Sequence, residues 1–285
     1  MVSDTASTSW ICPSCGSTAT ARYCGNCGER RLGVDRTSAE TRELAVDRAH
    51  SFFDRARASV YALVSPPGRL TADWIRGRRV GYLAPLSLFL WINVAFFLIQ
   101  SISGLGILTW PLRVHLSDDS IGWLTNWLLA QRKPGVGAAM GGYADIFNAL
   151  EAVHAKSLVI VMVPAFAAIL GALTLDRREP FRHMLTFTTH FFSFALLWLC
   201  LLFPIAAIVL RLIVGGGAAV NHAMDLAVSA VEAGGLAWYL YIALGTVFDM
   251  SWLRRSITVV ALIAAQYAIL KAYHLVVFTV TLYST

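Results

Sequence analysis

Five long apolar segments follow residue 81, and they constrain the fold of this chain more than any other feature. A hydrocarbon core about 30 Å thick is crossed by about 20 helical residues. Four of the five segments reach about this length, and only the segment at Ala233–Phe248 is short. The segments are Tyr82–Ser103, Ser157–Leu175, Met184–Val214, Ala233–Phe248 and Ser256–Tyr283. The sequence therefore predicts an all-α polytopic membrane bundle of about five transmembrane helices.

The composition argues against a soluble globule. Hydrophobic residues make up 57% of the 285 residues and charged residues 14%, with a mean hydropathy of +0.61. This apolar share exceeds that of soluble domains by about ten percentage points. The ionisable residues gather at the ends of the chain and between the apolar segments.

Two cysteine motifs precede the apolar segments: Cys12-Pro-Ser-Cys15 and Cys24-Gly-Asn-Cys27. This spacing places two thiolates on each tight knuckle, and two knuckles can surround one ion. Residues 1–34 are too few to bury a stable core, so a metal is expected to supply the missing stability. The sequence predicts a zinc-ribbon head at 1–34 that holds one structural zinc. Three glycines fit the sharp backbone turns of such knuckles, often with positive φ: Gly16, Gly25 and Gly28.

Other interpretations of the four cysteines stay open. They are disulfides, a redox pair, or an iron centre of rubredoxin type, and a cytoplasmic head argues against disulfides. A closed four-thiolate site has no open position for substrate, so we expect a docking or folding element without catalytic residues. Nucleic-acid binding is weakly signalled, because the arginines of the head lack interleaved aromatic residues beyond Tyr23.

Basic residues predict the orientation in the membrane. Arginines gather before the first apolar segment, between the second and third, and between the fourth and fifth: Arg76, Arg78, Arg79, Arg177, Arg178, Arg182, Arg254 and Arg255. All of them face the cytoplasm if the N-terminus is cytoplasmic, which puts Thr285 outside. Residues 1–34 contain no apolar stretch typical of a signal peptide, so the first span is expected to act as its own insertion signal. We expect a multi-pass protein of a bacterial cytoplasmic membrane.

Two further regions have helical patterns. Residues 35–80 are predicted to form an amphipathic juxtamembrane helix from Thr37 to Val64 and a basic linker, with Phe52 and Phe53 on the apolar face. Such a helix lies in the headgroup plane or packs on the bundle. Residues 81–285 form the predicted bundle, with an outer loop at 104–156 that contains two short helices, the first capped by Ser117.

One basic motif resembles a known family. Gly77-Arg78-Arg79-Val80-Gly81-Tyr82-Leu83-Ala84-Pro85 follows a cysteine-rich head and a Pro-Gly turn, as in the bacterial membrane family called domain of unknown function 3667. The second and third spans are similar too, although Met184 and Phe192 stand where other members carry histidines. The resemblance implies an integral membrane protein with a zinc-ribbon head and no established activity. The missing histidines argue against a metal site within the spans.

The same basic motif offers candidate ligands for a phospholipid or polyprenyl-phosphate headgroup: Arg76, Arg78, Arg79 and Tyr82. Each basic residue beside an anionic surface contributes about 1 kcal/mol of attraction. The alternative interpretation is that these residues only satisfy the positive-inside and aromatic-belt patterns.

Polar residues inside the apolar segments are the remaining candidates: Asn93, Gln100, His190, Lys271 and His274. We expect Lys271 to face the bundle interior with Glu232 or Asp225 nearby, and Asp176 or Asp249 to lie near His190. The polar groups then hold helices together, line a proton or solute pathway, or serve an intramembrane enzyme.

The sequence as a whole predicts an interaction or regulatory membrane protein. Its head is expected to engage a cytoplasmic protein partner or the lipid surface. The alternatives are a small transporter or channel that uses spans one, three and five, and an intramembrane lipid-modifying enzyme. The oligomeric state and the partner stay open.

Overall fold

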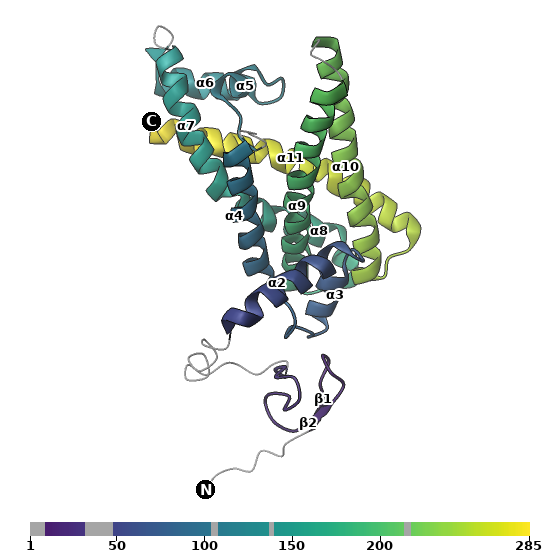
Figure 1. Cartoon of the computed structure of the whole chain (residues 1–285). Coiled ribbons are helices and arrows are strands. Elements are labelled where there is room, and N and C mark those ends of the chain that lie inside the picture. The colour runs from purple at the N-terminus through teal and green to yellow at the C-terminus, as the bar shows by residue number, and fades with distance from the viewer. Residues whose placement is uncertain (1–8, 32–47, 104–107, 137–139, 214–217) are drawn as a thin grey trace.

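A computed structural model of the chain describes residues 9–31, 48–103, 108–136, 140–213 and 218–285. It confirms an all-α membrane bundle with a small cysteine-rich head at the N-terminus (Figure 1). The head contains the antiparallel strands β1 (Trp10–Ile11) and β2 (Thr18–Ala19). Two short 3-10 turns, η2 (Val159–Val161) and η3 (Leu175–Arg177), flank one of the bundle helices. The helices are α2 (Arg48–Val64), α3 (Arg69–Ile75), α4 (Pro85–Ser103), α5 (Leu112–Ser117), α6 (Gly122–Arg132), α7 (Met140–Leu158), α8 (Met162–Leu173), α9 (Phe181–Ile213), α10 (Ala218–Phe248) and α11 (Trp252–Ser284).

Five helical segments within the described residues are long and apolar enough to cross a membrane, which confirms the predicted number. They are Pro85–Ile102, Met140–Leu173, Phe181–Cys200, Ser229–Phe248 and Trp252–Ser284. The second begins well before the expected Ser157, because α7 continues through η2 into α8. Much of the segment expected as an outer loop is therefore helical, as α5, α6 and most of α7.

The first loop helix is capped differently from the prediction. Ser117 is the last residue of α5 and does not cap α6. The Asp118 carboxylate instead accepts hydrogen bonds from the backbone amides of Ser120 (3.0 Å) and Ile121 (3.0 Å), immediately before α6. An aspartate side chain commonly satisfies such unpaired amides at a helix start.

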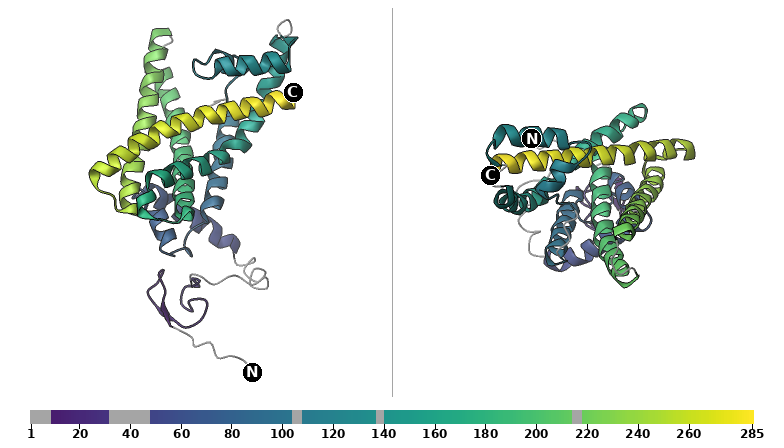
Figure 2. Two further views of the ribbon diagram at one scale, coloured as in Figure 1. Left: turned by 180° about the vertical axis from the view of Figure 1, so that it is seen from behind. Right: turned by 90° about the horizontal axis from the view of Figure 1, so that it is seen from above.

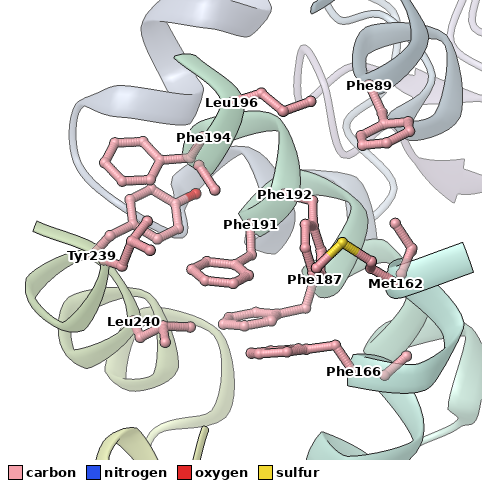
Figure 3. Packing of buried hydrophobic residues seen from close by; sticks show 14 of the residues in the cluster. Phe89, Met162, Phe166, Phe187, Phe191, Phe192, Phe194, Leu196, Tyr239 and Leu240 are labelled. Atoms are coloured by element: carbon pink, nitrogen blue, oxygen red, sulfur yellow. The ribbon is translucent and has the colours of Figure 1, made fainter. Parts of the chain in front are cut away.

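The main core is aromatic and centres on α9, which packs against α4, α8 and α10 (Figure 3). Phe191 of α9 stacks on Phe166 of α8 with ring centroids 5.0 Å apart, and Phe194 stacks on Tyr239 of α10 at 3.9 Å. Met184 and Phe192 are buried in this core. In lipid, close packing of this kind replaces the hydrophobic effect as the main force between helices.

A second, smaller core joins the last helix to the loop helices at the opposite end of the bundle from the head. It consists of Leu112, Leu129, Phe147, Phe278 and Leu282, contributed by α5, α6, α7 and α11. With 33 residues, α11 is about 50 Å long by its rise per residue, which is more than a hydrocarbon core needs. It crosses the bundle obliquely (Figure 2), as expected of a helix longer than the bilayer is thick.

The juxtamembrane helix packs on the bundle. On α2, the Phe52 ring lies 5.2 Å from the Trp91 ring of α4, and the Ser59 hydroxyl accepts a hydrogen bond of 2.8 Å from the Leu83 amide. Phe53, predicted on the same apolar face, is 77% exposed and does not pack on the bundle. The predicted N-terminal part of this helix, residues 37–47, lies outside the described residues.

The turn before α3 requires a glycine. Gly68 has a φ of +85°, and a Cβ atom built there would lie 2.8 Å from the Ala243 Cα atom of α10. Any larger residue would face both backbone strain and a clash with the α10 backbone. This close approach brings α3 into the bundle and buries Leu70, Thr71, Ala72 and Asp73.

Candidate metal centre and its contact with the basic loop

The four cysteines of the head form one cluster. The Sγ atoms of Cys12, Cys15, Cys24 and Cys27 all lie within 4.8 Å of one another. The pairs Cys12–Cys27 and Cys15–Cys24 are each 3.5 Å apart. That separation is far too long for a disulfide but close to the ~3.8 Å between sulfurs of a tetrahedral zinc site with Zn–S bonds of ~2.3 Å. The donor set therefore fits one four-coordinate metal ion.

The two knuckles have the same backbone geometry. The amides of Gly16 and Gly28 donate to the carbonyls of Cys12 and Cys24, at 2.9 and 2.8 Å. Both glycines have a φ of +75°, as expected of a sharp turn, whereas Gly25 does not have a positive φ. The predicted positive φ is therefore confirmed at Gly16 and Gly28, which each end a knuckle, and not at Gly25.

Without a metal, the pKa values of two thiols of the cluster are shifted in opposite directions. The neighbouring Ser17 hydroxyl and amide lower the pKa of Cys15 to about 6, while burial raises the pKa of Cys27 to about 12. Four thiolates at these distances repel one another strongly, so a cation is needed to hold all four deprotonated.

Glu29 links the head to the basic loop at residues 77–80. Its carboxylate is buried and accepts hydrogen bonds from the Arg79 amide (2.8 Å), the Val80 amide (3.1 Å) and the Ser14 hydroxyl of the first knuckle (2.7 Å). Arg78 adds a second contact, because its Nε donates to the Pro13 carbonyl at 2.8 Å. Two backbone amides beside arginines form a typical site for an anionic group. In this structure, the carboxylate of the head occupies that site.

Sequence reasoning missed Glu29. A signal was present, since it is the only acidic residue between Ser9 and Arg31 and follows the second knuckle directly. Two of its partners are the main-chain amides of residues 79 and 80, about fifty positions away, and no pattern of side chains in the sequence indicates such main-chain contacts.

Asp73 organises the basic loop from the bundle side. Its buried carboxylate accepts a hydrogen bond of 3.1 Å from the Tyr82 hydroxyl and lies 3.5 Å from Arg78 and 3.8 Å from Arg69. Burial, followed by the bond to Asp73, raises the pKa of Tyr82. Two of the four headgroup candidates, Arg78 and Tyr82, therefore hold the loop in shape.

The other two headgroup candidates lie differently. The Arg79 guanidinium is placed over the Trp74 ring, 5.2 Å from its centroid, and burial lowers its pKa. Arg76 is exposed at the end of α3. The structure thus brings Arg78, Arg79 and Tyr82 to one loop that faces the head, with Arg76 beside it.

Several predicted juxtamembrane arginines gather at this same end of the bundle. Arg177 donates to the Phe248 carbonyl, and Arg254 pairs with Asp176, which lowers the pKa of that carboxyl. These contacts tie the turn between α8 and α9 to the turn between α10 and α11. Asp176 and Asp249 were expected near His190; in the structure Asp176 forms an ion pair with Arg254.

Lys271 and His190 have separate surroundings. Lys271 forms an ion pair with Asp118 and lies over the rings of Trp110 and Tyr267. Glu232 or Asp225 was the expected neighbour, and the side chain of Asp225 lies outside the described part of the structure. His190 is fully buried, and its Nδ1 lies 2.9 Å from the Thr71 hydroxyl of α3. Only 17% of the Lys271 side chain is exposed, and its avoidance of lipid stays a prediction.

The remaining polar candidates are Asn93, Gln100 and His274. Asn93 is half-buried on α4, and Gln100 is buried two turns further along the same helix. His274 is buried on α11 and stacks on Trp110, with ring centroids 3.9 Å apart. The structure brings His274 close to Lys271 and places His190 with α3.

Comparison with known proteins gives one family. The model of the family described as Protein of unknown function (DUF3667) matches residues 57–97. No curated protein and no solved structure matches the chain. The match covers the C-terminal part of α2, all of α3, the basic loop and the first part of α4, and it includes the Gly77–Pro85 motif. The resemblance of this chain to the DUF3667 family is thereby confirmed, on the segment that receives the cysteine-rich head.

Proposed function

We propose that this protein is an interaction or regulatory membrane protein, in which the metal-binding head controls access to the basic loop of residues 77–80. One observation carries the proposal: the Glu29 carboxylate of the head accepts the Arg79 and Val80 amides. When the head releases the loop, those amides and the flanking arginines can bind another anionic group. A phospholipid headgroup is the best candidate, since the loop immediately precedes the first span.

The metal is expected to govern this contact. Ser14, which bonds to Glu29, lies between two of the metal ligands, and Pro13, which accepts from Arg78, lies beside them. Both contacts depend on the knuckle backbone that the metal holds in place. Loss of the metal should therefore free the loop. Structural zinc is the proposed ion.

Hydrogen exchange tests the contact directly. We expect slow exchange of the Arg79 and Val80 amides in the zinc-loaded protein, and at least tenfold faster exchange in Glu29→Gln, because a neutral amide oxygen is a weaker acceptor than a carboxylate. Glu179→Gln is the matched control, since Glu179 is an exposed carboxylate whose hydrogen bond goes to His183. Equal exchange in Glu29→Gln and wild type would contradict the proposal.

Native mass spectrometry of gently solubilised protein tests the ligand class. Glu29→Gln is expected to retain more anionic phospholipid than wild type or Glu179→Gln, since its loop has lost the internal carboxylate. A copurifying protein in place of lipid would assign the loop to a cytoplasmic partner and overturn the lipid assignment.

The proposed topology has the head in the cytoplasm of a bacterial cell and Thr285 outside. The gathering of arginines at the head end of the bundle supports it. Reporter fusions at residues 30 and 180 are expected to give cytoplasmic signals, and fusions at 140, 225 and 285 external ones. A cytoplasmic signal at 285 would contradict an odd number of spans.

A further inference from the structure

Three buried side chains meet at the end of the bundle opposite the head. They are His115 of α5, Glu151 of α7 and His274 of α11, with 0%, 1% and 1% of each residue exposed. One ligand atom from each lies within 4.8 Å of the other two. Imidazole nitrogens and a carboxylate oxygen are the donors of many zinc and other transition-metal sites.

Three imidazole nitrogens of this cluster lack a hydrogen-bond partner. In the described part of the chain, these buried atoms are His115 Nδ1, His115 Nε2 and His274 Nδ1. Buried polar atoms are nearly always paired, so three such nitrogens at one place call for an explanation. A metal ion would accept the one lone pair that each neutral imidazole ring offers, and its positive charge would offset the buried Glu151 carboxylate. The N–H of each ring would stay outside the coordination.

A direct histidine–carboxylate hydrogen bond does not explain the cluster. His115 Nε2 and Glu151 Oε1 are 3.9 Å apart, beyond the range of a hydrogen bond. Two ligands about 2.0–2.2 Å from a tetrahedral zinc lie roughly 3.4 Å apart, so small side-chain rotations would close the site on an ion.

The surrounding contacts hold the three ligands in position. The Trp110 amide donates to Glu151 Oε1 at 2.9 Å, and the Trp110 ring stacks on His274. The Thr125 hydroxyl of α6 donates to the His115 carbonyl at 2.7 Å, and the Tyr273 hydroxyl joins α11 to the Ala155 carbonyl of α7 at 2.8 Å. Such outer contacts, which fix ligand orientation, are typical of metal sites.

One cation near the cluster has its own counter-charge. Lys271 lies one turn before His274 on α11, and its charge is compensated by Asp118. Phe147 and Phe278 wall off His115, with ring centroids 6.1 and 5.2 Å away. The site is thus a buried enclosure with room for one ion between three helices.

We propose that His115, Glu151 and His274 form a second metal site, which binds a divalent first-row transition ion such as zinc. The ion joins α5 and α7 to α11 and leaves a fourth position for water or a small anion. This site is separate from the head, and the proposal does not rest on the proposed function.

Metal stoichiometry of the full-length protein tests the proposal. After chelation and dialysis against zinc, elemental analysis should find two zinc ions per wild-type chain. The variant with all four head cysteines replaced by serine should keep one. Adding Glu151→Gln to that variant should weaken its zinc binding at least tenfold, while the amide oxygen still accepts the Trp110 hydrogen bond.

A matched histidine provides the control. His154 lies on α7 near the cluster, but its Nδ1 is 3.0 Å from the Thr281 hydroxyl, so His154→Asn should leave the stoichiometry at two. In the variant without the four head cysteines, cobalt(II) should give visible d–d bands without the sulfur-to-cobalt charge transfer of the head. If that variant binds neither zinc nor cobalt, or binds them equally well after Glu151→Gln is added, the second site is overturned.

Discussion

Replacing Cys12, Cys15, Cys24 and Cys27 by serine is expected to abolish the fold of the head. The buried apolar cluster of the head contains Ala19 and two of the cysteines, with Trp10 packed against them, which is too little to stabilise a domain of this size. Structural zinc contributes apparent binding free energies of about 10–16 kcal/mol in small zinc-binding peptides. Removal of the ion should therefore unfold residues 9–31 while the helical bundle remains.

Amide hydrogen exchange and elemental analysis measure this outcome together. The variant with the four head cysteines replaced should lose one zinc per chain, and its knuckle amides at Gly16 and Gly28 should exchange at rates typical of unfolded chains. The control is Cys200→Ser, because Cys200 lies on α9 and outside the cluster. Iron in the wild-type head, or a head that stays folded without its cysteines, would contradict the zinc assignment.

Breaking the pair between Lys271 and Asp118 is expected to have the second-largest effect. Only 17% and 13% of these side chains are exposed, so loss of one partner leaves the other charged in a poorly solvated place. Such changes cost about 3 kcal/mol. Lys271→Met and Asp118→Asn should each lower the free energy of unfolding in detergent micelles by about that amount. The double variant should recover much of the loss, since neither charge is then buried alone.

The exposed pair Arg254–Asp176 is the control for this experiment. It has the same chemistry, but 32% and 59% of its side chains are exposed, so Arg254→Met should have little effect on stability. Equal losses at the two pairs would argue against burial as the cause. A double variant as unstable as both single variants combined would show that the pair itself does not contribute.

The same pair predicts a pH dependence. Burial alone would raise the pKa of Asp118, but hydrogen bonds from Lys271, from the Ser120 hydroxyl and from two backbone amides hold it well below its usual range. A carboxyl with a lowered pKa contributes stability that is complete above its unfolded pKa of about 3.9 and is lost as the pH falls further. Wild-type stability should therefore fall below about pH 4 more steeply than that of Asp118→Asn.

Local patterns were enough to predict most of the architecture. The apolar segments specify five spans because backbone groups in lipid must be paired within a helix, and about 20 apolar residues meet that need. The cysteine spacing predicts one cluster because the four ligands lie within sixteen residues, from Cys12 to Cys27. The basic motif was recognisable because it is continuous, and the family match covers it.

Two differences between the predicted and observed helices have local causes. Phe53 follows Phe52 directly, and adjacent helical residues point about 100° apart, so only one of them faces the bundle. The predicted second span starts at Ser157, later than the observed one, because α7 contains polar residues such as Glu151. That residue is buried against α5 and α11 and does not face lipid.

The sequence by itself determined the helical membrane fold, the number of spans and the cysteine cluster, because each depends on residues close together along the chain. Only the tertiary structure decided the partners of the isolated charged and polar groups. The contact between Glu29 and the Arg79 amide depends on how the head docks. The pair Asp118–Lys271 depends on how the loop helices pack on α11. The cluster of His115, Glu151 and His274 depends on how α5, α7 and α11 pack. A buried charge must find compensation wherever packing brings a partner within reach, and no local spacing encodes that choice.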